Sequence, residues 1–188
     1  MNYFKVPEFL HDVFGEKQSI LEVFASILFA LIGTLLIYSL FDIESSHINS
    51  WRIILGFILI ADVLAGCIAN FTKGTNNYYA TRAKNRLIFI AIHIHIILIA
   101  LLLDAPLVSS ILIWIYTIIS ASIVNTLKGK VIQSFIAANL LCYGIFLVIY
   151  LSLPMWFLIV SLFFMMKVIF SFAVDHYNMK KIEIKSTY

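Results

Sequence analysis

The sequence predicts an all-α fold, a polytopic membrane bundle of six transmembrane helices with both termini in the cytoplasm. Three observations carry this prediction. Hydrophobic residues make up 62% of the chain and charged residues only 12%, whereas a soluble protein has about 25% charged residues. The apolar residues form six long blocks, and Lys and Arg gather in every second segment between them. We therefore expect residues 1–188 to form a single integral membrane domain.

Residues 1–18 come before the first apolar block and predict an interfacial amphipathic segment. Within it, Phe9, Leu10, Val13 and Phe14 share one helical face, and Gly15 ends the pattern. A short helix of this kind favours a position on the inner membrane surface, where it would anchor the chain. The first apolar block is too long for a signal-peptide core, so we expect it to be retained as a span.

Six blocks are long enough to cross a bilayer, for which a helix needs about 20 mainly apolar residues. The predicted spans are residues 19–40, 51–71, 87–103, 106–126, 131–153 and 155–174, followed by a cytoplasmic tail at 175–188. Pro106 and Pro154 predict tight turns directly before the fourth and sixth spans, because proline favours the start of a helix.

The direction of the spans follows from the positive charges, which favour cytoplasmic segments. An inside N-terminus places nearly all basic residues in the cytoplasm: Lys5, Lys17, Lys73, Arg82, Lys84, Arg86, Lys128, Lys130, Lys180, Lys181 and Lys185. The outward segments hold Arg52 together with Asp42, Glu44 and Asp104. Frequent Ile, Leu, Phe and Asn are typical of an AT-rich genome. We therefore predict a multi-pass protein of the plasma membrane, namely the bacterial inner membrane.

Ionisable residues inside spans are costly and mark candidate functional sites. Asp62, Gly66 and Asn70 recur every fourth residue and so share one helical face. The last span repeats this spacing with Lys167, Ser171 and Asp175, of which we expect Asp175 to lie near the interface in contact with water. At 1.5 Å per residue, a common depth of roughly 10–15 Å from the inner boundary is predicted for five of the polar residues. These are Asp62, His93, His95, Asn139 and Lys167.

This polar layer has two interpretations. As a site, Asp62 is a carboxylate, Lys167 is its counter-charge or a solute anchor, and a histidine titrates; the ligand or proton-handling candidates are Asp62, Asn70, His93, His95, Asn139 and Lys167. As structure, an Asp62–Lys167 pair holds two helices in register. His93 and His95 lie about 200° apart on a continuous helix. At most one of them is then expected to face the site, and a metal held by both would need a break in the helix.

Residues 72–86 form the longest polar segment and predict a basic loop without acidic residues. Its candidate lipid- or partner-binding residues are Lys73, Tyr78, Tyr79, Arg82, Lys84 and Arg86. They indicate either a site for a phosphate, an acidic partner or anionic inner-leaflet lipids, or simply a positively charged cytoplasmic loop. The segment lacks the spacing of a phosphate-binding or dinucleotide-binding loop. A protein partner or a homo-oligomer stays open, and no nucleic-acid partner, cofactor or metal is predicted.

Three classes of function fit these observations. A six-span bundle with a polar layer favours transport or binding of a small solute. In length and number of spans the chain is similar to the substrate-binding components of energy-coupling-factor vitamin transporters, although the Gly- and Pro-rich spans of that family are not evident. The alternatives are a metal-dependent intramembrane lipid hydrolase, with Asp62, one of the two central histidines and His176 as ligands, and a membrane interaction or sensor protein. Solute handling is favoured over catalysis.

Overall fold

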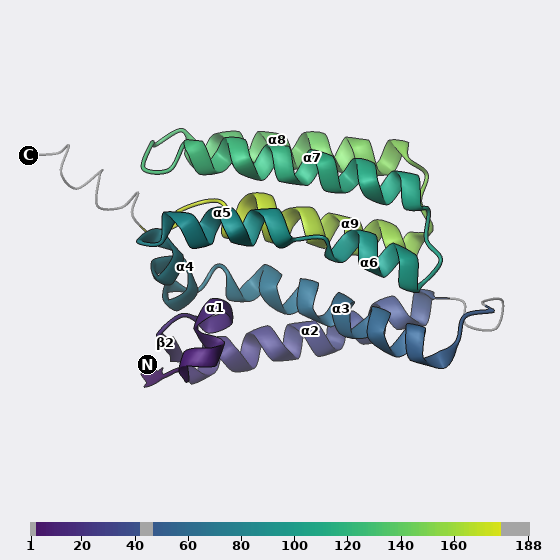
Figure 1. Cartoon of the computed structure of the whole chain (residues 1–188), viewed down its shortest axis with the longest axis horizontal. Helices are drawn as coiled ribbons and strands as arrows, with labels where there is room; N and C mark the ends of the chain where they lie inside the picture. The colour runs from purple at the N-terminus through teal and green to yellow at the C-terminus, as the bar shows by residue number, and fades with distance from the viewer. Residues whose placement is uncertain (1–2, 42–46, 178–188) are drawn as a thin grey trace, which may run out of the picture.

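Six helical spans run back and forth along one axis and pack into a bundle (Figure 1). The computed structural model describes residues 3–41 and 47–177. Its spans are α2 (Ile20–Leu40), α3 (Ser50–Ala69), α5 (Ala83–Ile92) continued by α6 (His95–Leu102), α7 (Leu107–Thr126), α8 (Gln133–Tyr150), and α9 (Met155–Met165) continued by the π-helix η2 (Met166–Phe172). All six are long and apolar enough to cross a membrane. The helical bundle is thus confirmed and indicates a multi-pass membrane protein, while its direction in the membrane stays a prediction.

The last span lies at the centre of the bundle. α9 packs against α2, α3 and α8, and η2 packs against α3, α7 and α8. Phe157, Phe164, Met165 and Ile169 are completely buried along it. By contrast, many large apolar side chains of the outer helices are exposed, as expected for surfaces that face lipid.

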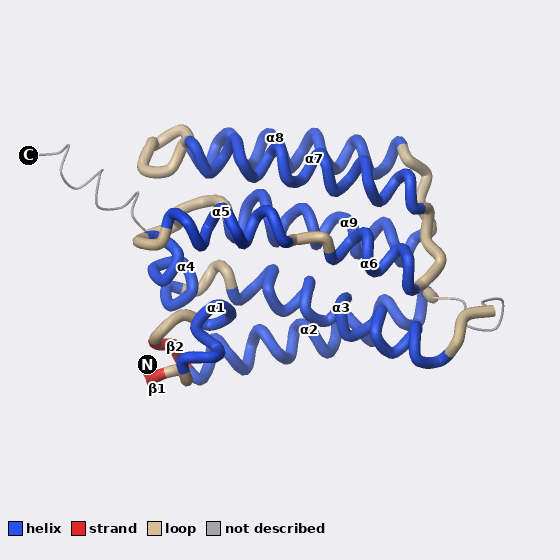
Figure 2. The backbone as a smooth tube through the Cα atoms, in the orientation of Figure 1, coloured by secondary structure: helices blue, strands red, loops and turns tan. Residues whose placement is uncertain are grey.

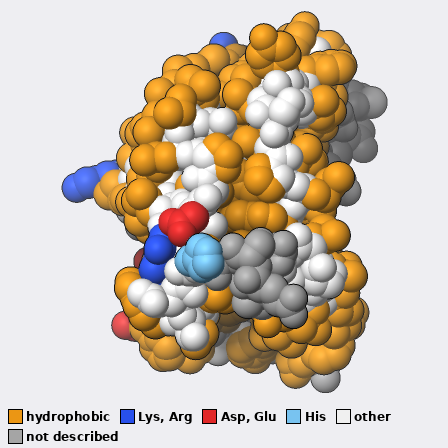
Figure 3. All heavy atoms as spheres, turned by 90° about the vertical axis from the view of Figure 1, so that its right-hand side faces the viewer, with side chains coloured by type: hydrophobic (Ala, Val, Ile, Leu, Met, Phe, Trp, Pro, Cys, Tyr) orange, Lys and Arg blue, Asp and Glu red, His pale blue; other side chains and the backbone are white. Residues whose placement is uncertain are grey.

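Tight turns join the spans at the end of the bundle that holds residues 103–106 and 151–154. Asp104 and Ser152 both have φ of 50°, and Pro106 and Pro154 follow as the N-caps of α7 and α9. Arg52 at the start of α3 forms a 2.5 Å ion pair with Asp104. Figure 3 shows this end, where only a few charged side chains interrupt a largely hydrophobic surface. The turns lie where the prolines predicted them.

The opposite end carries most of the described basic residues, and we call it the basic end. They are Lys5, Lys17, Lys73, Arg82, Lys84, Arg86, Lys128 and Lys130. Both the first described residues and the end of η2 lie there (Figure 1). This asymmetry of charge supports the predicted inside location of that end. The predicted tail charges Lys180, Lys181 and Lys185, and the outward Asp42 and Glu44, lie outside the described residues.

Residues 3–19, the N-terminal segment, fold back on themselves at the basic end. Strand β1 (Tyr3–Lys5) pairs antiparallel with β2 (Lys17–Ser19), as Figure 2 shows. Between the strands lie the 3-10 turn η1 (Glu8–Leu10) and the one-turn helix α1 (His11–Phe14). The amphipathic helix predicted here is therefore two short pieces inside a hairpin. Its position on a membrane surface stays a prediction.

The predicted basic loop is instead largely helical. Helix α4 (Lys73–Ala80) has Thr72 as its N-cap, whose side chain accepts a hydrogen bond from the Thr75 N–H at 3.4 Å. Threonine is a favoured N-cap because it satisfies one of the free N–H groups of the first turn. The next span then starts at Ala83, four residues before its predicted start.

Asp175 is a second correction, because we expected it in water and it is only 1% exposed. The helix ends at Phe172. Asp175 therefore does not continue the helical face of Lys167 and Ser171, although it follows Ser171 at the same four-residue spacing. Its backbone N–H donates to Gln133 Oε1 at 3.1 Å. The C-terminal end of the last span is thereby held against α8.

Candidate functional site

The centre of the site is an ion pair between α3 and η2. Lys167 Nζ donates to Asp62 Oδ2 at 2.8 Å and lies 3.3 Å from the Asp62 carbonyl oxygen. The two side chains differ in their surroundings, because that of Lys167 is 4% exposed and that of Asp62 is 49% exposed. The ammonium is therefore enclosed by protein, while the carboxylate faces open space.

Gly66 makes room for this pair. The stem of Lys167 crosses α3 directly over Gly66, where an added Cβ would lie 2.4 Å from Lys167 Cε and 2.8 Å from Nζ. Because Gly66 lies one helical turn after Asp62, a side chain at this position would displace the ammonium from the carboxylate. Lys167 itself belongs to a π-helical stretch, a conformation that is frequent at functional sites.

Both histidines face the site because the third span breaks between them. α5 ends at Ile92 and α6 begins at His95, and His93 between them has φ −76° and ψ 72°, which is not helical. The ring centroids of His93 and His95 are 5.1 Å apart. The expectation that only one of the two rings could face the site is therefore wrong, since it assumed a continuous helix.

Each histidine lies against an acceptor that indicates which ring nitrogen carries the proton. His95 Nε2 lies 3.3 Å from Asp62 Oδ2, and a carboxylate can only accept. His93 Nδ1 contacts the carbonyl oxygen of Phe89, which also can only accept. In its neutral form, His95 is therefore assigned a proton on Nε2, which faces the carboxylate, and His93 a proton on Nδ1, so that Nε2 of His93 is left as an acceptor.

A cavity of about 320 Å³ lies between α3 and α5 beside the ion pair. Its polar lining includes Asp62, Asn70, His93, His95 and Lys167, and Asp12, Tyr79 and Asn85 line it towards the basic end. The cavity thus brings together five of the six predicted candidates. Asn70 is 4% exposed, and its Nδ2 has no hydrogen-bond partner among the described residues.

Asn139 does not join this group. It lies on α8, outside the cavity, and its Nδ2 donates to the Phe135 carbonyl of its own helix at 2.9 Å. The predicted depth of a residue does not fix the direction in which its side chain points around the helix axis. We therefore leave Asn139 out of the site.

The N-terminal segment closes the cavity towards the basic end, where Asp12 and Val13 line it. Tyr79 Oη donates to the Asp12 carbonyl at 2.9 Å, and Thr75 Oγ1 donates to the Val13 carbonyl at 3.0 Å. Burial, together with the nearby Asp12 carboxylate, raises the pKa of the Tyr79 phenol, which therefore stays protonated and able to donate at neutral pH. Two bonds from α4 thus hold the segment over the cavity.

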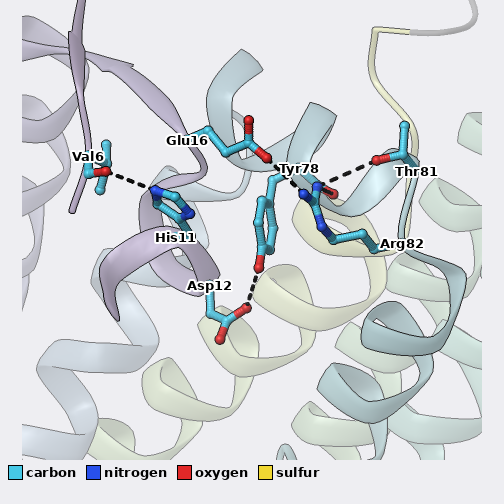
Figure 4. A network of polar contacts seen from close by, with 7 residues as sticks. All are labelled: Val6, His11, Asp12, Glu16, Tyr78, Thr81 and Arg82. Atoms are coloured by element: carbon cyan, nitrogen blue, oxygen red, sulfur yellow. Dashed lines mark hydrogen bonds and ion pairs between the residues drawn. The ribbon is translucent and has the colours of Figure 1, made fainter. Parts of the chain in front are cut away.

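A second set of contacts lies at the surface of this junction (Figure 4). Tyr78 Oη donates to Asp12 Oδ1 at 3.1 Å. Arg82 pairs with Glu16 at 2.7 Å, and its guanidinium lies 4.0 Å from the centre of the Tyr78 ring. Of the predicted lipid-binding residues, these two are already engaged within the protein.

The other basic-segment candidates divide by burial. Lys73 and Lys84 are exposed. Tyr79 is buried, and Arg86 is 1% exposed and bonds to Asn125 Oδ1 at 2.8 Å and to the Ala173 carbonyl at 2.7 Å. Only Lys73 and Lys84 are therefore free to meet a headgroup without rearrangement.

The apolar wall of the cavity was not predicted from the sequence. Ala65, Ile88, Phe89 and Ile92 line it. In the sequence they are ordinary apolar residues of two spans, and no spacing marks them. Only the position of the helix break relative to Asp62 identifies them.

The geometry also bears on the metal-dependent alternative. Within the described part of the chain, no group of three His, Cys, Asp or Glu side chains is arranged to hold a metal ion. His176 Nε2 contacts the carbonyl oxygens of Phe170 and Ser171 at 3.1 and 3.2 Å, and its ring packs against Phe71. The structure thus does not bring His176 together with Asp62.

Comparisons of the chain with protein-family models, with characterised proteins and with solved structures found no match. The similarity to vitamin-transporter components is therefore one of length and span count alone, and function has to be inferred from the cavity itself.

Proposed function

We propose that this chain is an integral membrane protein that binds a small solute in the cavity beside Asp62, as a carrier or as the solute-binding subunit of one. The observation that supports it most is the placement of the Asp62–Lys167 pair. A pair that served only to register two helices would be enclosed on both sides, because helix interfaces pack closely. Here the carboxylate is 49% exposed at the wall of a cavity.

The polar groups around the pair support the same proposal. A buried polar atom without a partner costs stability, so proteins keep few of them without a reason. Asn70 Nδ2 is such an atom in the cavity wall. A bound solute that accepts a hydrogen bond here would remove that cost.

The location belongs to the proposal as well. We place the chain in the plasma membrane, as in a bacterial inner membrane, with both termini in the cytoplasm. The concentration of Lys and Arg at the basic end supports this orientation. Exposed Lys73 and Lys84 would then lie close to anionic lipids of the inner leaflet.

The experiment is a stability screen of the purified protein in detergent against water-soluble metabolites, vitamins, metal ions and lipids. We expect at least one organic compound to raise the melting temperature, and Asp62→Asn and Lys167→Met to abolish that shift. Asp104→Asn, which removes a carboxylate at the other end of the bundle, is the matched control and should keep it.

Two results would contradict the proposal. If stabilising compounds act equally on Asp62→Asn, Lys167→Met and the unchanged protein, the cavity is not where they bind. If only a divalent metal ion stabilises the protein, and does so through Asp62, the metal-dependent alternative is supported instead.

A further inference from the structure

The cavity beside Asp62 reaches the outer surface of the bundle. Ile88 and Ile92 line it and are also 48% and 60% exposed. Exposed fractions this large mean that the cavity wall is here part of the outer surface. The helix break explains the opening, because α3 packs against α6 beyond the break, whereas α5 lies apart from α3 (Figure 1).

In a membrane, this opening would face lipid. α5 and α6 together form a span, and Ile92 is the last residue before the break. Asn85 and His95, at the two ends of the cavity along this span, are ten residues apart, or about 15 Å at the helical rise. The opening is therefore a lateral groove that runs from the basic end to the middle of this span.

The two walls of the groove have different chemistry. Ala65, Ile88, Phe89 and Ile92 form an apolar wall, whereas Asp62, His93 and His95 form a polar end. Binding sites generally combine an apolar lining with a few placed polar groups that orient the ligand. A ligand that fits both walls has an apolar body and one polar head.

The hydrogen-bonding groups define the head further. Lys167 Nζ and His95 Nε2 are both directed at Asp62 Oδ2, and His93 Nδ1 at the Phe89 carbonyl. Among the described residues, none bonds to Asp62 Oδ1, and His93 Nε2 is left as an acceptor. Asp62 Oδ1 and His93 Nε2 are thus two acceptors at the polar end, which suit a head that donates hydrogen bonds. Asn70 Nδ2 is a donor elsewhere in the lining, and an oxygen of the same ligand can accept from it.

We infer that the ligand is an amphiphile with a hydrogen-bond-donating head, a hydroxyl or a protonated amine, that enters the cavity from the lipid between α3 and α5. The head bonds to Asp62 Oδ1 and His93 Nε2, and the apolar body lies against Phe89 and Ile92. This inference rests on the proposed function and names the class of its solute.

The test uses three photoreactive probes on the full-length protein in lipid nanodiscs. The probes share one alkyl chain with a diazirine and differ in the head, which is a hydroxyl, a primary ammonium or a carboxylate. We expect the hydroxyl probe, the ammonium probe or both to label peptides of α3 and α5. The carboxylate probe should label about tenfold less, because the exposed Asp62 carboxylate repels its head. Asp62→Asn should reduce labelling by the hydroxyl and ammonium probes by a similar factor.

Two variants separate binding in the cavity from general contact with lipid. Ala65→Phe fills the apolar wall without removing a polar group and should abolish labelling. Ile58→Phe adds the same ring at a 57% exposed position of the same helix, outside the cavity, and should leave labelling unchanged.

The inference is overturned if all three heads label equally, if the carboxylate probe labels most, or if Ala65→Phe has no effect. Its failure can be told apart from that of the proposed function. If a water-soluble compound stabilises the protein through Asp62 while no probe labels the cavity, the proposed function is supported and the amphiphilic ligand is contradicted. If neither the stability screen nor the probes report binding, the proposed function and this inference are both contradicted.

Discussion

At the residue scale, the Asp62–Lys167 pair is asymmetric, and the asymmetry has energetic consequences. Lys167 is enclosed and relies on Asp62 for its counter-charge, whereas Asp62 is half exposed at the cavity wall and has His95 beside it as well. A charge left unpaired in a closely packed interior is far more costly than one at a cavity wall with a second polar group beside it. Removal of the carboxylate should therefore cost more than removal of the ammonium.

We predict that Asp62→Leu lowers the free energy of unfolding by about 3–5 kcal/mol, the usual cost of breaking a buried pair from one side. Lys167→Met should cost less, and the double variant Asp62→Leu/Lys167→Met should recover most of the loss. Denaturant titration in mixed micelles measures all three. A larger loss for Lys167→Met than for Asp62→Leu would contradict the assigned burial.

Gly66 gives a second prediction at this scale. Alanine normally stabilises a helix by about 1 kcal/mol relative to glycine, but here the new methyl group would meet Lys167 Cε. Gly66→Ala should therefore destabilise the protein, as seen in its melting temperature, and weaken solute binding. In Gly66→Ala/Lys167→Ala the steric conflict is absent, so the methyl group should no longer destabilise the protein relative to Lys167→Ala. A remaining loss of stability would show that another neighbour is responsible.

At the scale of elements, the break between α5 and α6 has the largest effect on the site. It brings both histidines to Asp62 and separates α5 from α3, which opens the cavity. The sequence contains no Gly or Pro at this break, only the run from Ile92 to Ile96. His93 Nδ1 contacts the carbonyl oxygen of Phe89 one turn earlier, and such a contact cannot be recognised from periodicity.

The N-terminal segment is the other element that shapes the cavity, and it depends on a close approach of two glycines. Gly15 has φ of 71°, and a Cβ there would lie 2.2 Å from the carbonyl oxygen of Gly74. We predict that Gly15→Val detaches residues 3–19 from α4, which hydrogen–deuterium exchange would report as faster exchange across the segment. Phe9→Ala, at an 82% exposed position of the same segment, is the control. Unchanged exchange in Gly15→Val would mean that the segment is not held at this point.

At the scale of the whole molecule, the sequence predicted the bundle well because a single physical requirement determines it. A span must be long and apolar, so both ends of four spans lie within two residues of their predicted positions, as in Ile20–Leu40 and Met155–Phe172. Four-residue spacing likewise predicted that Asp62, Gly66 and Asn70 would share a face, and all three line the cavity.

The remainder of the site could not be predicted because it depends on how the helices are rotated and where they deviate. Asn139 was placed by its depth alone, but its side chain does not line the cavity. Asp175 and Arg86 are buried by contacts from other helices, although their positions at the ends of spans favoured water. Asp12 reaches the cavity only because the N-terminal segment folds back.

The orientation in the membrane is a prediction for the whole molecule. Lys84 lies at the basic end and His47 at the opposite one, and both are exposed. In intact bacterial cells, a membrane-impermeant thiol reagent should modify His47→Cys and not Lys84→Cys, in a Cys142→Ser background. Modification of Lys84→Cys alone would invert the proposed topology.

The most direct measurement of the central claim, a solute-binding cavity beside Asp62, is the reactivity of a cysteine placed in its wall. In a Cys142→Ser background, Ala65→Cys should react rapidly with a small maleimide, and a compound that stabilises the protein should slow this reaction. Ala69→Cys, at a 1% exposed position of the same helix, provides the rate for a buried thiol. If Ala65→Cys reacts as slowly as Ala69→Cys, or at a rate that no binding compound changes, the cavity does not serve as the site.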